Sequence, residues 1–272
     1  MIRSDLHVHT SFCDGSDSPE TIAAEAYRRG FASIGFSGHG YTSFDSSFCM
    51  SLENTACYIS RIHALQEQYR DRMDVLLGIE KDAFSGPDGY SYDYVIASLH
   101  YIFINGEYRS VDESEESCSD TVRRHFGGDY LAFAKEYYRT LAERIPPMHA
   151  DIIGHFDLIT KFNENGKLFD TTLPEYRRAA LEALATIAEE HPIFELNCGA
   201  IARGYRNTPY PEDFLLREIR SRGCDVILSS DSHSAKTLGF GFSEACKRLV
   251  SLGFDHVKVK AASGFFDVSI SE

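Results

Sequence analysis

The sequence lacks the features that mark several large classes of protein. It has no tryptophan, and its 7 cysteines are scattered, odd in number and never in a CxxC spacing. Neither a disulfide framework nor a thiolate zinc cluster is therefore indicated, and we expect a reducing, cytoplasmic location. No run approaches the roughly 18 apolar residues of a membrane span, and no basic segment followed by an apolar one stands at the N-terminus. We therefore expect no membrane partner.

Positive charge is also scarce. The chain has 27 Lys and Arg residues against 41 Asp and Glu residues, which gives a formal net charge of -14. Such a chain is repelled by the phosphates of nucleic acids unless it carries a local basic patch, and only a few Lys and Arg residues ever stand together. We therefore expect no nucleic-acid partner. The sequence gives no indication of the oligomeric state.

What the sequence does contain is a regular alternation of β-rich and helical segments. It has 272 residues, of which 43% are hydrophobic, enough for a substantial core. In SPETIAAEAYRRG, Ser18 can cap a helix, Pro19 can open it and Gly30 can end it. The alternation runs through about seven or eight β/α repeats without a linker. It predicts one α/β domain over residues 1–272, as a closed TIM-like barrel or, alternatively, an open doubly wound sheet.

One segment breaks this alternation. Residues 105–128, NGEYRSVDESEESCSDTVRRHFGG, are polar and acidic and end in two glycines. We expect a long acidic loop beside the mouth of the barrel. A loop of this length often contacts substrate, although a solvated excursion without a function is an equal alternative.

Polar residues of one chemical kind follow the expected strands. His7 and His9 lie two apart in DLHVHTSFCDG, and side chains two apart on an extended chain point to the same face. In a β/α barrel the carboxyl ends of all strands converge on the face that carries the active site. The expected strands end, in order, at His7 and His9, His39, Glu80, His100, His155 and Asp157, Glu195 and Asn197, and Asp231 and His233.

These residues form a plausible ligand set for metal ions. Six of the 11 histidines stand at strand ends, joined by Asp14, Glu80 and Asp231. Imidazole and carboxylate groups suit zinc, manganese or iron, and nine ligands are too many for one ion. Two or three ions that share carboxylates would use them, and clustered cations commonly bind and cleave phosphate esters. The alternative, a hydrogen-bonded polar core, would bury these groups at a high desolvation cost.

Six motifs in order resemble the PHP (polymerase and histidinol phosphatase) superfamily. They are DLHVHT at 5–10, SGH at 37–39, GIE at 78–80, ASLH at 97–100, GHFD at 154–157 and SSDSH at 229–233. The segments GIEKDAF, YDYVIASLHYI and GHFDLITKF are further similar to the histidinol-phosphate phosphatases of histidine biosynthesis. The resemblance implies a distorted (β/α)7 barrel that holds three divalent metal ions.

The resemblance also implies which residues hold each ion. Glu80 is shared between two of the ions, and the choice among zinc, manganese and iron stays open because these ligands suit all three. The implied sets are His7, His9, Glu80 and Asp231 for one metal, Glu80, His100 and His155 for a second, and Asp14, His39 and His233 for a third.

The expected reaction is hydrolysis of a phosphate monoester. A hydroxide that bridges two metals would attack phosphorus, so Glu80 and Asp231 would act in catalysis through the ions, and Asp157 is a candidate acid for the leaving group. Phosphate should also meet a cation from the protein, for which Arg203, Lys161 and Arg206 are the candidates. Here the chain departs from the subgroup, because Thr160 and then Lys161 stand where we expect an arginine.

Three alternatives remain open. The chain could be a PHP phosphoesterase for another small phosphate, such as a nucleotide or sugar phosphate, or a non-catalytic metal-binding barrel with a regulatory role. It could also be an amidohydrolase-like enzyme, although that group often bridges its metals with a lysine and Lys81 would point away from Glu80. Beside the ligands, Glu195 and Asn197 could orient histidines by hydrogen bonds or cap the barrel sterically. Asp5 could act in a similar way, or it could be solvated, as a carboxylate at the start of a strand often is.

Overall fold

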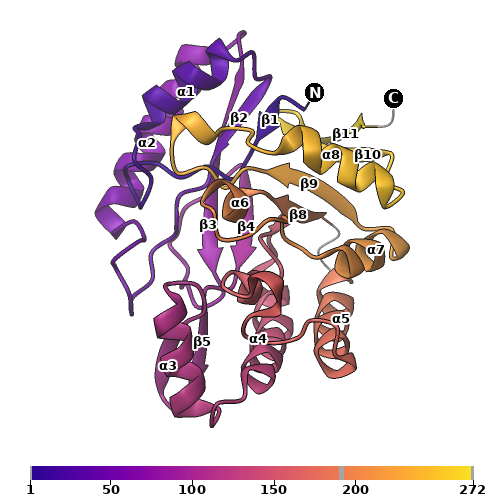
Figure 1. The fold of residues 1–272 in the computed structure, drawn as a ribbon. Coiled ribbons are helices and arrows are strands. Elements are labelled where there is room, and N and C mark those ends of the chain that lie inside the picture. The colour runs from indigo at the N-terminus through magenta and orange to yellow at the C-terminus, as the bar shows by residue number, and fades with distance from the viewer. Residues whose placement is uncertain (1, 190–192, 271–272) are drawn as a thin grey trace.

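The computed structural model describes residues 2–189 and 193–270 and has a curled, mainly parallel sheet at its centre (Figure 1). Seven parallel strands follow one another around the sheet in chain order. They are β1 (Ser4–Asp5), β2 (Ser33–Phe36), β3 (Asp74–Asp82), β4 (Tyr94–Ser98), β7 (Ile152–Ile153), β8 (Ile193–Asn197) and β9 (Asp225–Ser229).

The sheet closes at the carboxyl ends of its strands. Val8, just after β1, forms a parallel bridge with Ser232, just after β9. The His9 amide donates to the Ser232 carbonyl at 2.8 Å, and the Ser232 amide donates to the His7 carbonyl at 3.0 Å. The prediction of a distorted seven-stranded barrel is therefore confirmed, and the open doubly wound sheet is excluded.

Two further strands extend the sheet beside β9. β10 (His256–Ala261) pairs with β9 in parallel through one residue pair, Lys258 with Ile227, and with β11 (Gly264–Ser269) in an antiparallel hairpin. The alternation predicted β10 but not β11, because a terminal hairpin is not part of a β/α repeat.

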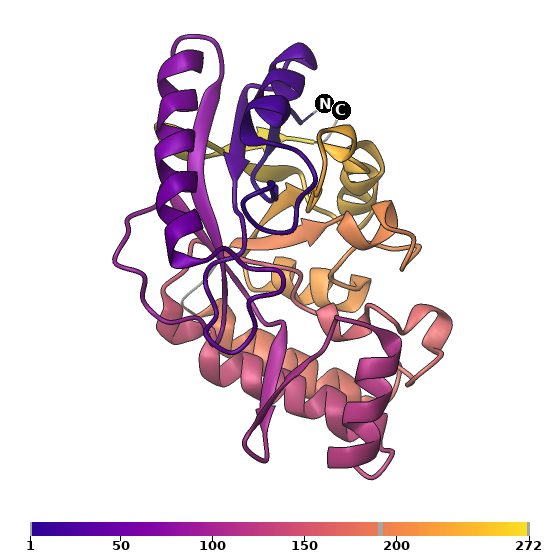
Figure 2. The same cartoon turned by 90° about the vertical axis from the view of Figure 1, so that its left-hand side faces the viewer.

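The helices cover the outside of the sheet (Figures 1 and 2). The first shows the expected signals, since the Ser18 hydroxyl accepts from the Thr21 amide at 3.3 Å, Pro19 opens the helix and Gly30 has a φ of 74°. The helices are α1 (Pro19–Arg28), α2 (Leu52–Tyr69), α3 (Glu115–His125), α4 (Tyr130–Arg144), α5 (Pro174–Ala188), α6 (Gly199–Ala202), α7 (Asp213–Ser221) and α8 (Phe242–Ser251), with 3-10 turns η1 (Pro146–Met148), η2 (Leu158–Thr160), η3 (Glu164–Gly166) and η4 (Ala235–Thr237). Among the described residues no helix is long and apolar enough to cross a membrane.

The expectation of a long loop over residues 105–128 is wrong. β5 (Tyr101–Ile104) and β6 (Glu107–Ser110) form a hairpin, and α3 follows within the same segment. Ser114 caps α3, and the helix has acidic residues in its first turn and basic residues in its last, as the helix dipole favours. These helix signals override the polar composition of the segment.

The interior of the barrel changes from apolar to polar along its axis. Leu6, Tyr94 and Ile96 belong to an apolar cluster within the sheet, and the Tyr94 hydroxyl donates to the Leu6 carbonyl at 2.5 Å. Gly78 makes room for this ring, since a Cβ there would lie 2.1 Å from Cζ of Tyr94. The apolar cluster thus fills the interior of the curled sheet, and the polar side chains gather at the carboxyl ends of the strands.

Candidate active site

The structure brings all nine expected ligands together at the carboxyl ends of the strands. Glu80 lies within β3, and the other eight lie in the connections that leave the strands. The backbone of residues 38–40 continues the parallel ladder beside β3, since the Glu80 amide donates to the Gly38 carbonyl at 3.2 Å and the Gly40 amide donates to the Glu80 carbonyl at 2.8 Å. This ladder places His39 next to Glu80.

Glu80 is the centre of the cluster. Its Oε2 lies 3.0 Å from Nδ1 of His39 and 3.2 Å from Nε2 of His7. Its Oε1 lies 3.0 Å from Nε2 of His155 and 3.4 Å from Nε2 of His100. One buried carboxylate thus faces four imidazoles from four different strand ends, as a ligand that bridges two ions should.

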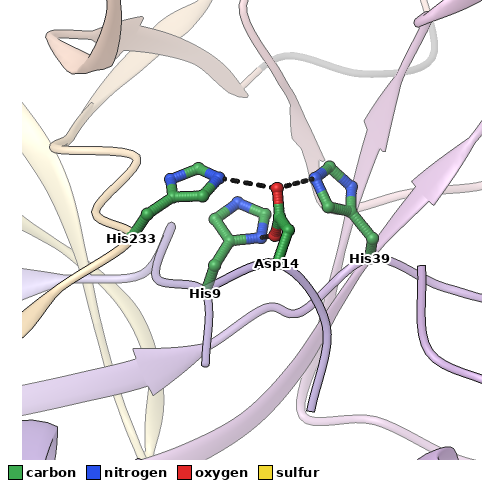
Figure 3. Close-up of side chains that lie close together, drawn as sticks. All are labelled: His9, Asp14, His39 and His233. Atoms are coloured by element: carbon green, nitrogen blue, oxygen red, sulfur yellow. Dashed lines mark hydrogen bonds and ion pairs between the residues drawn. The ribbon is translucent and has the colours of Figure 1, made fainter. Parts of the chain in front are cut away.

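A second group surrounds Asp14 near the cavity (Figure 3). Its Oδ2 lies 3.1 Å from Nε2 of His233 and 3.7 Å from Nε2 of His39, and its Oδ1 lies 3.4 Å from Nδ1 of His9. One nitrogen or oxygen from each of these four side chains lies within 4.8 Å of the others. The structure therefore groups the three ligands expected for one ion and adds His9 to them.

Asp231 faces the two histidines that follow β1. Its Oδ1 lies 3.3 Å from Nε2 of His9 and 3.8 Å from Nε2 of His7. Asp231 has a φ of 49°, and a Cβ at Gly199 would lie 2.7 Å from its Oδ2. The side chain of Asp231 therefore depends on a glycine beside it.

The unsatisfied atoms of the cluster fit a bound cation. Nδ1 of His7 lies 2.5 Å from Oε1 of Glu195, so a neutral His7 that donates this hydrogen bond directs the lone pair of Nε2 at Oε2 of Glu80. Both Nε2 of His7 and Oε2 of Glu80 are buried and lack a hydrogen-bond partner among the described residues. Two lone pairs 3.2 Å apart repel each other unless a proton or a metal cation lies between them, so this pair of atoms can hold either.

The charges of the cluster set its protonation. Burial opposes protonation of His7, but Glu195, Glu80 and Asp231 attract a proton and raise its pKa well above the usual range. Burial, with the neighbouring His233 and His39, lowers the pKa of His9 to about 3. Although burial opposes ionisation of Asp231, Arg203 and His7 hold its pKa well below the usual range. His9 is thus neutral and Asp231 ionised, which are the forms that bind metals, whereas His7 holds a proton that a bound metal ion would displace.

Other buried residues hold the ligands in place. Oε2 of Glu195 accepts from the His155 amide at 2.8 Å and from the Asn197 side chain at 3.0 Å, in addition to the contact of Glu195 with His7. Asp82, which the sequence analysis did not single out, accepts from the His100 amide at 2.8 Å. Such contacts fix the orientation of metal-binding histidines.

Of the two alternatives for Asp5, the structure excludes the solvated carboxylate. Its side chain is fully buried and accepts hydrogen bonds from the Ser230 amide at 3.2 Å, the Ser230 hydroxyl at 2.5 Å and the Gly239 amide at 2.9 Å. Asp5 thereby ties β1 to the segment that carries Asp231 and His233. The alternation of polar and apolar residues around a two-residue strand could not indicate these contacts.

A cavity of about 300 Å³ opens over the cluster. Several of its lining residues were not singled out in the sequence, because they come from connections without a recognisable pattern. The acidic character of residues 112 and 113 was visible, but their place at the cavity depends on the β5–β6 hairpin. These additional lining residues are Asp45, Ser47, Phe48, Tyr101, Ser110, Asp112, Glu113, Leu158 and Tyr205.

Two of the three candidate phosphate-binding cations reach this cavity. Arg203 lines it and donates to the Asp231 carbonyl at 2.8 Å and to Oδ2 of Asp231 at 2.9 Å. Lys161 also lines it. Arg206 lies outside the cavity, since its buried guanidinium binds the Thr160 hydroxyl and lies 3.7 Å from Oε1 of Glu212.

The candidate acid Asp157 also lies outside the cavity. Its side chain is fully buried, and its Oδ2 accepts from the Glu212 amide at 3.0 Å. Burial raises the pKa of Asp157 to about 7. Burial away from the cavity therefore separates Asp157 from any leaving group there, and a direct proton transfer is not supported.

Comparisons with known proteins agree with this architecture. The family model for the PHP domain matches residues 5–199. A protein named probable histidinol-phosphatase in Deinococcus radiodurans is 31% identical over 264 residues, which cover 92% of this chain and 93% of that protein. The histidinol-phosphatase of Bacillus subtilis is 25% identical over 272 residues, 91% of this chain and 100% of that protein.

Solved structures show the same fold. A protein of Listeria monocytogenes described as a histidinol phosphatase superposes with a TM-score of 0.74 at 20% identity, over 89% of this chain and 100% of that one. A histidinol phosphate phosphatase of Lactococcus lactis, crystallised with zinc, L-histidinol and phosphate, superposes with a TM-score of 0.68 at 20% identity, over 97% of this chain and 98% of that one.

Proposed function

The chain belongs to the PHP domain family, and from this premise we propose that it is a metal-dependent phosphoric monoester hydrolase that converts histidinol phosphate to histidinol and phosphate. The observation that carries the proposal is the cluster of nine histidine, aspartate and glutamate side chains at one cavity, in a chain that is similar to histidinol-phosphatases over most of its length.

We propose that the cluster holds three divalent ions of zinc, manganese or iron. Glu80 would be shared, and when bound the ions would supply Lewis acidity and activate water for attack on phosphorus. Glu195 would keep His7 directed at the site, and Asp82 would do the same for His100. The ligand sets are His7, His9, Glu80 and Asp231, then Glu80, His100 and His155, and then Asp14, His39 and His233, with His9 close enough to serve either the first or the third.

Arg203 and Lys161 would bind the phosphoryl oxygens. Both side chains line the cavity that opens over the cluster, and a guanidinium and an ammonium group both donate to phosphate. Arg203 is already oriented by its two contacts with Asp231. These cations offset the negative charge of the substrate beside the carboxylates of the site.

The opposite charge on another part of the wall favours histidinol phosphate over sugar phosphates. Asp45 and Glu113 line the cavity, and the pKa of Asp45 lies below its usual value because hydrogen bonds from Tyr101 and Ser47 outweigh its burial. Histidinol carries an ammonium group and an imidazole. The carboxylate of Asp45 and the aromatic ring of Tyr101 next to it can both bind these cationic groups. A neutral sugar has no cation that could bind to the carboxylate or the ring.

We further propose that residues 1–272 form a single domain that acts in the cytoplasm in histidine biosynthesis. It would take a small phosphorylated substrate and would need neither nucleic acid nor a membrane. The continuous sheet order from β1 to β11 supports the single domain.

The test is a substrate panel. The purified protein, loaded in turn with manganese, zinc and iron, would be assayed for phosphate release from histidinol phosphate, a nucleotide monophosphate and a sugar phosphate. We expect kcat/KM to be at least about tenfold higher for histidinol phosphate, the effect of one charged contact. A preference for another ester would retain the phosphoesterase and reject the substrate.

A further inference from the structure

The ammonium group of Lys161 is held by the backbone and side chain of Asp112 and by two aromatic rings. Its ammonium donates to the Asp112 carbonyl at 2.7 Å and to Oδ2 of Asp112 at 3.0 Å. It also lies 5.1 Å from the centre of the Tyr205 ring and 5.6 Å from that of the Phe162 ring. These two rings pack edge to face, so one carboxylate and two aromatic rings fix the position of the charge.

The same contacts leave one donor of the ammonium available. A lysine ammonium has three N–H groups, and Asp112 accepts two of them. The ammonium makes no other hydrogen bond to the residues that the structure describes, while both Lys161 and Asp112 line the cavity. The third N–H group is therefore free to meet an anion there.

Asp112 is itself built into the segment that separates β4 from β7. The Ser110 hydroxyl accepts from the Asp112 amide at 3.2 Å and from the Glu113 amide at 3.0 Å, and Ser114 then caps α3. Burial opposes ionisation of Asp112, but the positive charge of Lys161 stabilises the carboxylate and lowers the pKa of Asp112. The carboxylate is thus ionised and held by a tight turn.

We propose that Asp112 is a positioning residue for phosphate binding, which holds Lys161 so that its free N–H group binds a phosphoryl oxygen. This inference rests on the proposed function and deepens it, since it assigns part of the substrate site to the turn between β6 and α3. A lysine on its own is a flexible point charge, and it lacks the fork of the arginine expected near this position. The two hydrogen bonds to Asp112 hold the Lys161 ammonium in one place, and so compensate for the flexibility of the lysine side chain.

A double-mutant cycle tests the proposal by direct binding. The dissociation constant of inorganic phosphate would be measured by calorimetry on the metal-loaded protein for Asp112→Ala, Lys161→Ala and the double variant. We expect each single variant to raise the constant about tenfold, the effect of one charged hydrogen bond. The double variant should bind no more weakly than Lys161→Ala, because Asp112 acts only through Lys161. Glu116→Gln on the exposed side of α3 is the matched control and should bind phosphate like the wild type.

Two further measurements separate positioning from a loss of structure. Asp112→Asn keeps the size of the side chain, so its dissociation constant for phosphate should lie between those of the wild type and Asp112→Ala. In all single variants KM for p-nitrophenyl phosphate should rise by a larger factor than kcat falls. Single effects that multiply in the double variant, an unchanged constant in Asp112→Ala, or a lower kcat at constant KM would overturn the proposal. If the cycle shows the expected coupling between Asp112 and Lys161 in phosphate binding, but the wild-type protein does not hydrolyse histidinol phosphate, only the proposed function is rejected.

Discussion

The surroundings of His7 show how a single residue acquires its role. The imidazole is fully buried between Glu195 on one nitrogen and Glu80 and Asp231 on the other. Without a cation this arrangement favours protonation of His7, whereas a divalent ion would take the place of the proton. The charge of Glu195 would therefore affect metal binding through His7, since Glu195 contacts Nδ1 of His7 and not Nε2.

We predict that Glu195→Gln lowers metal affinity by roughly 10- to 100-fold, because the neutral amide no longer supports the basicity of His7. Metal titration of the stripped protein, followed by activity at each concentration, measures the effect. The exposed Glu182→Gln on α5 is the control. Equal metal affinity in Glu195→Gln and the control would show that His7 needs no such support.

Asp45→Asn should change substrate preference. Loss of the carboxylate should lower kcat/KM for histidinol phosphate about tenfold and leave that for p-nitrophenyl phosphate within about twofold, because only the first substrate carries a cation. The two assays on one preparation provide their own control. A parallel loss on both substrates would place Asp45 in support of the fold and not in recognition.

At the scale of residues, the sequence predicted which histidines and carboxylates cluster, but not which residues line the cavity above them. His7, His9 and Glu80 were predictable because strand geometry and a known order of motifs both constrain them. The place of Asp45 at the cavity and of Arg206 outside it was not predictable. These positions depend on the paths of the connections between strands and on local partners such as Thr160, which binds Arg206. A side chain type alone does not say whether a cation faces a cavity or a buried hydroxyl.

At the scale of elements, the β5–β6 hairpin connects the inserted segment to the mouth of the cavity. Tyr108 on β6 stacks on Phe44 with ring centres 3.8 Å apart and an angle of 9°, and Phe44 packs against Tyr101. Tyr101 in turn donates to Asp45 at 2.6 Å. The hairpin thus helps to hold the segment that carries Asp45.

Tyr108→Ala should loosen this connection. Loss of the stacked pair removes about 0.5–1.5 kcal/mol of local stabilisation, which we expect to appear as faster proteolysis near residue 44 and a higher KM. Tyr90→Ala is a matched control, because Tyr90 is 42% exposed and Tyr108 41%. Proteolysis and KM that match those of the control would show that the hairpin does not hold the mouth.

Elements with local signals were predicted well. α1 has a cap, a proline and a terminal glycine, all within 13 residues of sequence, and it forms as expected. The composition of residues 105–128 concealed α3, whose buried face consists of only Cys118, Thr121 and Val122. Most other residues of this helix are polar or charged, so its few apolar positions did not stand out against the composition of the segment.

At the scale of the whole molecule, the barrel closes through contacts between residues more than 200 positions apart. Asp5 binds Ser230, and Val8 pairs with Ser232. The length of the chain and its alternation predicted a closed barrel, but neither could show that β1 meets the segment after β9. That closure is what brings His7 and His9 next to Asp231.

Because the ligands come from many parts of the chain, metal removal should destabilise the whole barrel. Binding to the native state alone contributes about 4 kcal/mol at a metal concentration 1,000 times Kd, which corresponds to a Tm lowered by roughly 10 °C on chelation. Differential scanning calorimetry with and without a chelator measures this shift. An unchanged Tm would mean that the cluster is stable without ions.

The most direct test of the account is the metal dependence of histidinol phosphate hydrolysis in protein stripped of metal. We predict that phosphate release is lost on stripping, returns when manganese, zinc or iron is added, and stays absent in His9→Ala, while His63→Ala on the exposed face of α2 behaves like the wild type. Full activity in the stripped protein, or in His9→Ala, would contradict a metal-dependent site at this cluster.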